Sequence, residues 1–452
     1  MPTGFADLRD TLQTLGDKGR LLQVEEPVDA AFEAAALLAA AARRGDGAVL
    51  LSRIEGSTVP VCGNLVHSRE VLGWALGVAE EAVPAELTRR LGSPIPPVLT
   101  GDGPVQAVEA KASLAQTLPI LTHYRSDSGP FITTGLLSAR DPVTGVVARG
   151  IHRMELRGEN ELGVALMNPP LADVYAQHKH QGTPMPVAVV VGIDPLTFCA
   201  FALKGSPQVD KLAIAGGLRG SPVEVTTAAH TGIPVPARAE FLLEGEIDPT
   251  DERKDGPLGE IGGYSMAFAA TPTFRVRRIT HRVDPIYHAL LPTGPEGDLL
   301  LATVAEASIA SRVAELFPFA RRYHFVPSTF GSSLVVQVAP APRAQVRSLL
   351  VHLVTLGMVK KVVAVADDVD PGDPVEVEWS VATRCQPDLD GMILSDLKGH
   401  VIDPSCPKLF HTAKLALDAT GYERVRGHQR AVLDPDAVIR AATLLPERSS
   451  HG

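Results

Sequence analysis

The chain contains 452 residues, too many for one ordinary hydrophobic core, so the length predicts two or three domains. Hydrophobic residues make up 45% and charged residues 21%, proportions typical of a folded globular protein. The formal net charge is -10 and no block of lysines or arginines is longer than a pair, so nucleic-acid binding is not expected. An anionic ligand must therefore be bound by the charges of a local pocket, because the net negative charge of the whole chain would repel it.

Cysteine usage and hydropathy bear on location. The four cysteines are scattered without a CxxC pair, which argues for a reducing compartment and against a disulfide frame or a thiolate zinc site. The first nine residues lack a basic stretch followed by an apolar core, so they do not resemble a secretory signal. No stretch reaches the roughly 18 uninterrupted apolar residues that a bilayer-spanning helix needs. We therefore expect a cytoplasmic protein with no membrane association.

The first part of the chain alternates helix-like and strand-like segments. An alanine-rich amphipathic run from Asp29 to Arg43 predicts a helix with an acidic N-cap, which ends at Gly45. Residues 48–51 then predict a short buried strand. Prolines and glycines between residues 94 and 103 predict a boundary, so we expect residues 1–104 to form an N-terminal α/β domain.

Strand-like runs dominate the middle of the chain, residues 105–295. Strands are predicted at 133–138, 146–156, 186–193, 222–226, 239–246 and 274–279, and helical inserts at 171–181 and 208–216. Many short strands separated by turn residues predict a β-barrel or a β-sandwich.

Alternation of helices and strands returns in residues 296–452. Helices are predicted at 303–316 and 342–357, strands at 323–327, 333–339 and 362–366, and a final helix at 434–445. This pattern predicts a C-terminal α/β domain.

Two acids bracket a Gly-Pro-Leu-Gly turn between Asp255 and Glu260. Glycine lets a backbone approach a ligand and proline stiffens the segment, so both carboxylates can be held in place. A general acid needs such a fixed position, and partial burial would raise its pKa. On spacing alone, however, a solvated acidic turn between two strands is the favoured interpretation.

A second candidate lies within the strand predicted at 146–156. Strand alternation places Arg149, Ile151 and Arg153 on one face and Gly150 and His152 on the other. Two arginines on one face can grip a carboxylate or phosphate, but an exposed strand face with solvated arginines fits equally well. The hydroxyls and glycines of residues 127–135 likewise suit either an anion or a simple turn.

In their order along the chain, these segments resemble the UbiD family of prenylated-flavin-dependent (de)carboxylases. Residues 127–135 look like the family's Gly-Pro-aromatic-Ile-Thr segment, 150–153 like the strand that ends in its catalytic arginine, and 255–260 like its acidic-GPxGE signature. Residues 212–225 are close to its AG-x-LRG-x-PVEV stretch. The resemblance is clearest from about residue 120 to 420 and includes further matches at 367–371, 379–384, 387–390, 403–404 and 418–420.

The resemblance implies an α/β multidomain architecture, with an N-terminal α/β domain, a central split β-barrel that binds the flavin, and a C-terminal α/β domain with a role in dimerisation. It implies a carboxy-lyase that decarboxylates an α,β-unsaturated or aromatic carboxylic acid reversibly, with prenylated FMN (prFMN) as the electron sink. A flavin prenyltransferase would supply the cofactor, and the assembly would be a homodimer or an assembly of dimers. The alternatives are a non-catalytic subunit or flavin carrier with this fold, and an enzyme that catalyses a different flavin reaction.

The resemblance also implies residue roles. Arg153 would hold the substrate carboxylate, Glu260 would donate the proton that replaces CO2, and Asp255 takes the position of a second acid that is usually glutamate. The cofactor-binding residues expected are Thr133, Thr134, Gly150, Ile151, His152 and Met167, together with Asn168 and Lys211 at positions where the sequence departs from the family.

The sequence departs from the family where an Asn, a His and a Glu usually hold a divalent metal at the flavin phosphate. The matching positions fall on Ala148, Asn168 and Lys211, which cannot hold a hard divalent cation, so no metal is predicted. Our hypothesis is that Lys211 replaces the metal as a point charge and Asn168 adds a hydrogen bond. The alternative is that Lys211 is a solvated lysine on a helix and that the chain no longer binds flavin.

Overall fold

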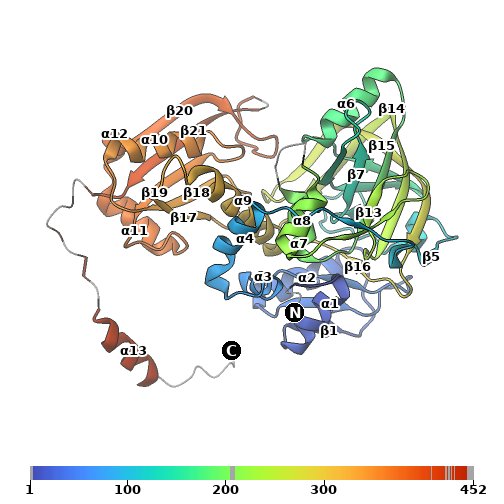
Figure 1. The fold of residues 1–452 in the computed structure, drawn as a ribbon, viewed down its shortest axis with the longest axis horizontal. Coiled ribbons are helices and arrows are strands. Elements are labelled where there is room, and N and C mark those ends of the chain that lie inside the picture. Colours follow the sequence, from blue (N-terminus) through green and yellow to red (C-terminus); the bar gives the residue numbers. More distant parts are fainter. Residues whose placement is uncertain are drawn as a thin grey trace.

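The computed structural model of the chain describes residues 4–203, 209–408, 410–422, 425, 428, 430, 431 and 433–444. Figure 1 shows a β-rich central part, drawn in green and yellow, with the blue N-terminal part against it and the orange C-terminal part to one side. Helix α9 (Pro295–Val313) lies between these parts. The chain is a multidomain α/β protein, as predicted.

The N-terminal part is built on a four-stranded sheet in the order β1-β2-β3-β16. Its elements are α1 (Leu8–Asp17), β1 (Leu21–Val24), α2 (Glu33–Arg44), β2 (Ala48–Leu51), β3 (Val61–Gly63), α3 (Arg69–Leu76), η1 (Glu80–Ala82) and α4 (Val83–Leu91). The predicted helix is α2, and it ends at Gly45 in the left-handed conformation. The acidic N-cap is wrong, because Asp29 instead accepts a hydrogen bond from the Ala31 N–H at 2.8 Å and the helix begins after Phe32.

The central part contains a nine-stranded antiparallel sheet in the order β6-β9-β10-β15-β14-β11-β7-β8, with β5 paired to β15. Its strands are β5 (Val108–Glu109), β6 (Phe131–Ile132), β7 (Leu136–Arg140), β8 (Val147–Ile151), β9 (Met154–Gly158), β10 (Glu161–Val164), β11 (Met185–Val191), β14 (Phe241–Gly259) and β15 (Ser265–His281). In the part of the chain that the structure describes, the end strands β6 and β8 do not pair, so the sheet stays open as in a split barrel.

The strand predicted at 146–156 is divided. Residue Ile151 of β8 pairs with β7, whereas Met154 of β9 pairs with Ile132 of β6, at the other end of the sheet. His152 and Arg153 form the crossing between them and belong to neither strand. The predicted single face with both arginines is therefore wrong, because the chain changes sheet neighbours between Arg149 and Arg153.

Short helices and a small sheet complete the central part. They are η2 (Pro104–Gln106), α5 (Leu114–Thr117), α6 (Leu171–Gln181), α7 (Pro195–Ala202), α8 (Lys211–Arg219) and the three-stranded sheet β13-β12-β4, with β4 (Val98–Leu99), β12 (Glu224–Thr227) and β13 (Pro234–Pro236). The predicted inserts correspond to α6 and α8, although residue 208 lies outside the described residues. Helix α7 was not predicted, because it is apolar and buried almost all round and shows no amphipathic period.

The C-terminal part is a five-stranded sheet in the order β17-β18-β19-β21-β20, flanked by helices. Besides α9, its elements are β17 (Ala320–Phe325), β18 (Ser333–Val338), α10 (Arg343–Val354), β19 (Lys361–Ala366), α11 (Pro374–Arg384), α12 (Pro387–Asp390), β20 (Gly391–Lys398), β21 (His411–Ala419) and α13 (Pro435–Leu444). The predicted alternation is confirmed here, with the loop between β20 and β21 carrying residues that reach the candidate site.

The division at residues 104/105 and 295/296 stays a prediction. Strand β16 (Tyr287–His288) joins the N-terminal sheet through β3, and β4 pairs with β12. Two hydrophobic cores likewise combine residues from before and after residue 104, whereas a third comprises residues 309–416 only. The first two parts therefore pack as closely joined units. Among the described residues, no helix is long and apolar enough to cross a membrane.

Candidate active site

A cavity of about 310 Å³ lies where the central part meets the C-terminal part. This volume falls in the range of roughly 300–1,000 Å³ that is typical of small-molecule and cofactor sites. Nine predicted site residues line it, namely Thr133, Gly150, Ile151, His152, Arg153, Met167, Asn168, Lys211 and Glu260. The fold thus brings together positions that are more than a hundred residues apart in sequence.

Two predicted residues do not line the cavity. Asp255 is fully buried and lies behind Arg153, to which it is bonded. Thr134 is also buried, and its hydroxyl donates to the His288 carbonyl oxygen at 2.6 Å. Asp255 therefore acts on the cavity through Arg153, and the predicted cofactor contact of Thr134 has no support from its position.

Arg153 is held between the two predicted acids. Its Nη1 donates to Glu260 Oε1 at 2.6 Å, its Nε donates to Asp255 Oδ1 at 3.1 Å, and Nη2 bonds the same oxygen. The guanidinium also lies 4.7 Å from the centre of the Phe268 ring. The Arg153 side chain is only 8% exposed and that of Asp255 is fully buried, so the interpretations as a solvated arginine and a solvated acidic turn are wrong.

The acidic turn lies in the β14–β15 hairpin, and a loop that contains Asp127 packs against it. Gly256 has φ +80, and a Cβ there would lie 2.8 Å from the Met266 oxygen and 3.1 Å from Arg153 Nη2. Glycine therefore permits both the left-handed backbone and the close approach of the arginine. The Asp127 carboxylate accepts a hydrogen bond from the Gly259 N–H at 3.0 Å, which fixes the backbone next to Glu260.

The charges around Arg153 do not balance. Arg157 Nε lies 3.3 Å from Glu155 Oε2, and Arg157 Nη2 lies 3.8 Å from Asp255 Oδ2. The guanidiniums of Arg153 and Arg157 therefore face three carboxylates, those of Glu155, Asp255 and Glu260. Burial raises the pKa of Asp255 and of Glu260, and Arg153 opposes this effect in both. Glu260 is the most exposed of the three acids, at 19%, and the only one of them that lines the cavity. The cluster therefore suits one bound proton, with Glu260 placed to give it to a ligand.

Further basic groups line the cavity beside α8. Arg149 is buried and bonds Asp210 Oδ1 at 2.8 Å, Ser138 Oγ at 2.8 Å and the Pro234 oxygen at 2.9 Å. The interpretation of Arg149 as a solvated surface arginine is therefore wrong. His152 Nδ1 bonds the Ala165 oxygen at 2.8 Å, and burial lowers the pKa of His152 to about 4, so the ring is neutral.

Lys211 is the remaining basic residue there. Its Nζ donates to the Phe201 carbonyl oxygen at 2.6 Å, and burial lowers its pKa to about 8. The side chain therefore does not behave as a solvated lysine on a helix, and that interpretation is wrong. Lys211 is instead a partly buried ammonium in the wall of the cavity.

The side chains at the three positions of the family's metal ligands do not fit a divalent metal. An alanine methyl, an amide and an ammonium occupy positions 148, 168 and 211, whereas Mg²⁺ and Ca²⁺ require several oxygen ligands. In the described ranges, no group of three or more His, Cys, Asp or Glu side chains is placed to hold a metal. A flavin does fit, because the cavity joins aromatic side chains of Phe198, Phe201 and Phe268 to the partly buried ammonium of Lys211.

Several lining residues were missed in the sequence. The walls include Phe198 and Phe201 from α7, Leu300 and Leu301 from α9, and residues 400–402 from the β20–β21 loop. The local sequence pattern does not distinguish apolar residues of a buried helix that contact a ligand from those that only pack in the core. The loop reaches the cavity only through the packing of the C-terminal part. The α9 and loop contributions place the cavity between two parts of the chain, where ligand sites are common.

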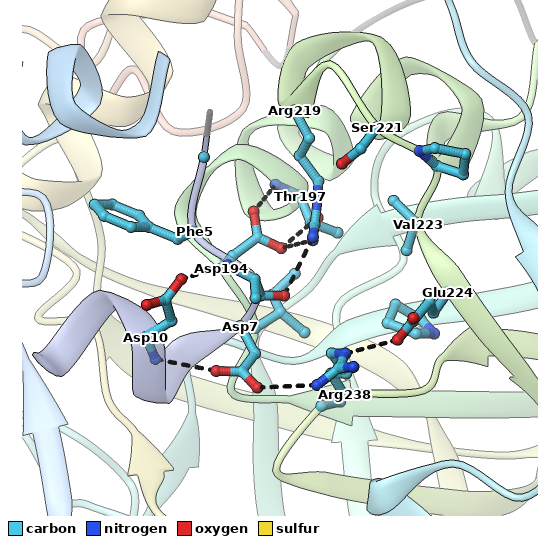
Figure 2. Close-up of a pocket in the computed structure, with 16 residues that line it drawn as sticks. Phe5, Asp7, Asp10, Asp194, Thr197, Arg219, Ser221, Val223, Glu224 and Arg238 are labelled. Atoms are coloured by element: carbon cyan, nitrogen blue, oxygen red, sulfur yellow. Dashed lines mark hydrogen bonds and ion pairs between the residues drawn. The ribbon is translucent and has the colours of Figure 1, made fainter. Parts of the chain in front are cut away.

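A second cavity, of about 450 Å³, lies among the N-terminal segment, α8 and the β12–β13 sheet (Figure 2). Its arginines are already paired, Arg219 with Asp194 and Arg238 with Glu224, each at 2.6 Å. None of the predicted site residues lines it. Its arginines therefore already have carboxylate partners within the chain, and the cavity at Arg153, which nine predicted site residues line, is the candidate active site.

The sequence matches three domain models of a single family. They are described as the N-terminal, Rift-related and C-terminal domains of UbiD, 3-octaprenyl-4-hydroxybenzoate carboxy-lyase, and they match residues 12–91, 97–295 and 298–419 respectively. Together these matches cover most of the chain.

Curated and solved relatives agree with these matches. Anhydromevalonate phosphate decarboxylase of Methanosarcina mazei is 32% identical over 416 residues, which cover 91% of this chain and 95% of the relative. The UbiD-class enzyme HmfF of Pelotomaculum thermopropionicum, in complex with FMN, has a TM-score of 0.90 and 32% identity, covering 96% of this chain and 99% of HmfF. An evolved dimeric form of HmfF in complex with prFMN has a TM-score of 0.88 and 31% identity, with coverage of 97% and 100%.

Proposed function

The chain belongs to the UbiD family and is a carboxy-lyase, and from this premise we propose that it removes CO2 from an α,β-unsaturated carboxylic acid with prFMN as its cofactor. Anhydromevalonate phosphate is the compound named for the relative in Methanosarcina mazei. As a dehydrated hydroxy acid it is unsaturated, which favours an unsaturated over an aromatic acid. An acid of this class that also bears a phosphate is therefore the first candidate substrate.

The observation that carries the proposal is the position of Arg153 between Asp255 and Glu260 in the cavity wall. A guanidinium has five N–H donors, and among the described residues four of them are used, by Asp255 twice and by Glu260 and Met266 once each. The fifth, on Nη1, is available for the substrate carboxylate. Asp255 holds the guanidinium in the orientation that presents this donor.

Glu260 would supply the proton. When the bond between the carboxylate and the α-carbon breaks, CO2 leaves and the electron pair stays with the substrate carbon. That carbon then takes the proton from Glu260, and the partly exposed carboxylate regains one from water. The raised pKa of Glu260 keeps this proton available at a higher pH than an ordinary glutamate would.

The residues that would hold the cofactor are Thr133, Gly150, Ile151, His152, Met167 and Asn168, all of which line the same cavity. When bound, prFMN supplies the electron sink that makes the loss of CO2 accessible. The neutral His152 ring and the aromatic side chains of Phe198, Phe201 and Phe268 form part of the cavity wall. A bound cofactor and substrate would displace water from the cavity, which strengthens the contacts that Arg153 and Glu260 make with the substrate.

The test is CO2 release from a panel of unsaturated and aromatic acids, with and without phosphate, by protein co-expressed with a flavin prenyltransferase. We expect release from at least one unsaturated acid and its loss in Arg153→Ala. A non-catalytic subunit would release no CO2 from any acid while still carrying the cofactor. An enzyme with a different flavin reaction would convert an acid without losing CO2.

Assembly and location are part of the same proposal. The dimeric form of HmfF supports a homodimer or an assembly of dimers, which light scattering of the purified chain would measure. All four cysteines are free and three are buried, which supports a reducing compartment such as the cytoplasm. A molar mass of one chain at micromolar concentration would contradict the proposed dimer.

A further inference from the structure

We propose that Lys211 binds the phosphate of the flavin directly and replaces the divalent metal at this position. The inference rests on the proposed flavin function and specifies how this chain anchors the cofactor.

Charge balance around the cavity singles out Lys211. Three lysine or arginine side chains line the cavity, and two of them are neutralised, Arg149 by Asp210 and Arg153 by its two acids. Within the described residues, no carboxylate lies within 4.0 Å of Lys211 Nζ, whose only hydrogen bond is to the Phe201 oxygen. The cavity therefore has one uncompensated cation, and an ammonium has two further donors to offer a ligand.

Partial burial makes the charge of Lys211 costly unless an anion is bound to it. The lowered pKa of Lys211 arises from desolvation alone, with no opposing carboxylate. An anion bound at Nζ would remove that penalty, and a phosphate dianion would do so most strongly. The reacting carboxylate of the substrate already has a partner in Arg153, which carries an unused Nη1 donor and is bonded to the proton donor Glu260.

The residues at the usual metal-ligand positions suit a phosphate and oppose a metal. Asn168 lines the same cavity, and its side-chain amide can donate a hydrogen bond to a phosphate. The methyl side chain of Ala148 cannot bind a metal. A divalent cation would face the positive charge of Lys211 with one amide oxygen as its ligand. Lys211 is also the first residue of α8, a nine-residue helix, so its charge adds to the positive end of the helix.

The test compares FMN with riboflavin, which lacks the phosphate, in fluorescence titrations of the cofactor-free full-length chain. We expect the wild type to prefer FMN, and we expect EDTA to leave this preference unchanged. Lys211→Met should weaken FMN binding about ten- to a hundredfold, the effect of one hydrogen bond to a charged group, and leave riboflavin binding unchanged. Lys211→Arg should restore most of the preference. Lys111→Met, which removes an exposed lysine outside the cavity, should bind both flavins as the wild type does.

Three outcomes would overturn the inference. The first is a loss of FMN binding in EDTA that Mg²⁺ or Mn²⁺ restores, a measurement that needs no variant to fold. The second is Lys211→Met that binds FMN as the wild type does. The third is a loss of binding in Lys211→Met that affects only a phosphorylated acid substrate and not FMN. This result would assign Lys211 to the phosphate of the substrate. A wild type that binds neither flavin would instead refute the proposed function itself.

Discussion

Replacement of Glu260 by glutamine tests the proposed proton donor with little change in shape. The glutamine carbonyl oxygen can still accept the hydrogen bond that Glu260 Oε1 receives from Arg153 Nη1 at 2.6 Å. With all groups ionised, the cluster holds two guanidiniums and three carboxylates, and the substitution leaves two of each. The variant therefore resembles the protonated state of the wild type and lacks only a transferable proton.

The expected effect on catalysis is large and the expected effect on stability is small. Loss of a positioned general acid lowers the rate by about 10²–10⁴-fold, so we expect kcat for CO2 release to fall by this factor. A change in the free energy of unfolding of about 1 kcal/mol corresponds to a Tm shift of about 2–4 °C in a domain of 150–250 residues, and we expect no more. The assay is CO2 release by protein loaded with prFMN, with Tm measured on the same samples.

The matched control is Glu252→Gln, the same chemical change on the same strand β14, where Glu252 bonds Tyr175 and Lys179 away from the cavity. We expect its kcat to equal that of the wild type. A folded Glu260→Gln variant whose kcat lies within about tenfold of the wild type would refute the assignment of Glu260, because a rate so close to normal requires another proton donor.

Three further outcomes follow from the structure. Because burial raises the pKa of Glu260, kcat should fall as pH rises through that pKa, and a Glu260→Gln variant with the same alkaline limb would contradict this. Gly256→Ala should lower kcat more than Gly263→Ala, since both glycines have positive φ but only the first would place a Cβ near Arg153; equal rates would contradict the account. Burial raises the pKa of Glu306 from 4.5 to about 7. The free energy of unfolding of the wild type, relative to that of Glu306→Gln, should therefore be greatest below pH 4.5. It should decline by about 3 kcal/mol between pH 4.5 and pH 7, because the carboxylate must then be ionised while buried. Thermal unfolding of both proteins at pH 4 and pH 8 measures this decline, and an unchanged Tm difference would be the contrary result.

Elements with local signals were predicted well from the sequence. Helix α6 has its predicted bounds because its last turn is basic and Gly182 ends it in the left-handed conformation. Helix α7 has no such period, since nearly every side chain is buried, and its contribution to the cavity was missed. The break between β8 and β9 was missed because the change of sheet neighbour at His152 leaves no mark in the local pattern.

The candidate site was predictable from the order of segments rather than from spacing. Spacing alone favoured a solvated acidic turn, and this was wrong because the burial of Asp255 is a tertiary effect of the β14–β15 hairpin and Arg153. The residues at 400–402 that border the site lie in a loop of the C-terminal part, and no local pattern connects them to Arg153. The resemblance identified the chemical groups, whereas the packing around them required the structure.

The measurement that tests the central claim most directly is release of labelled CO2 from carboxyl-labelled unsaturated acids by this chain loaded with prFMN. We predict release that requires prFMN, is absent with plain FMN, and is lost in Arg153→Ala although the cofactor remains bound. Release that persists in Arg153→Ala, or no release from any acid by fully loaded protein, would contradict the account.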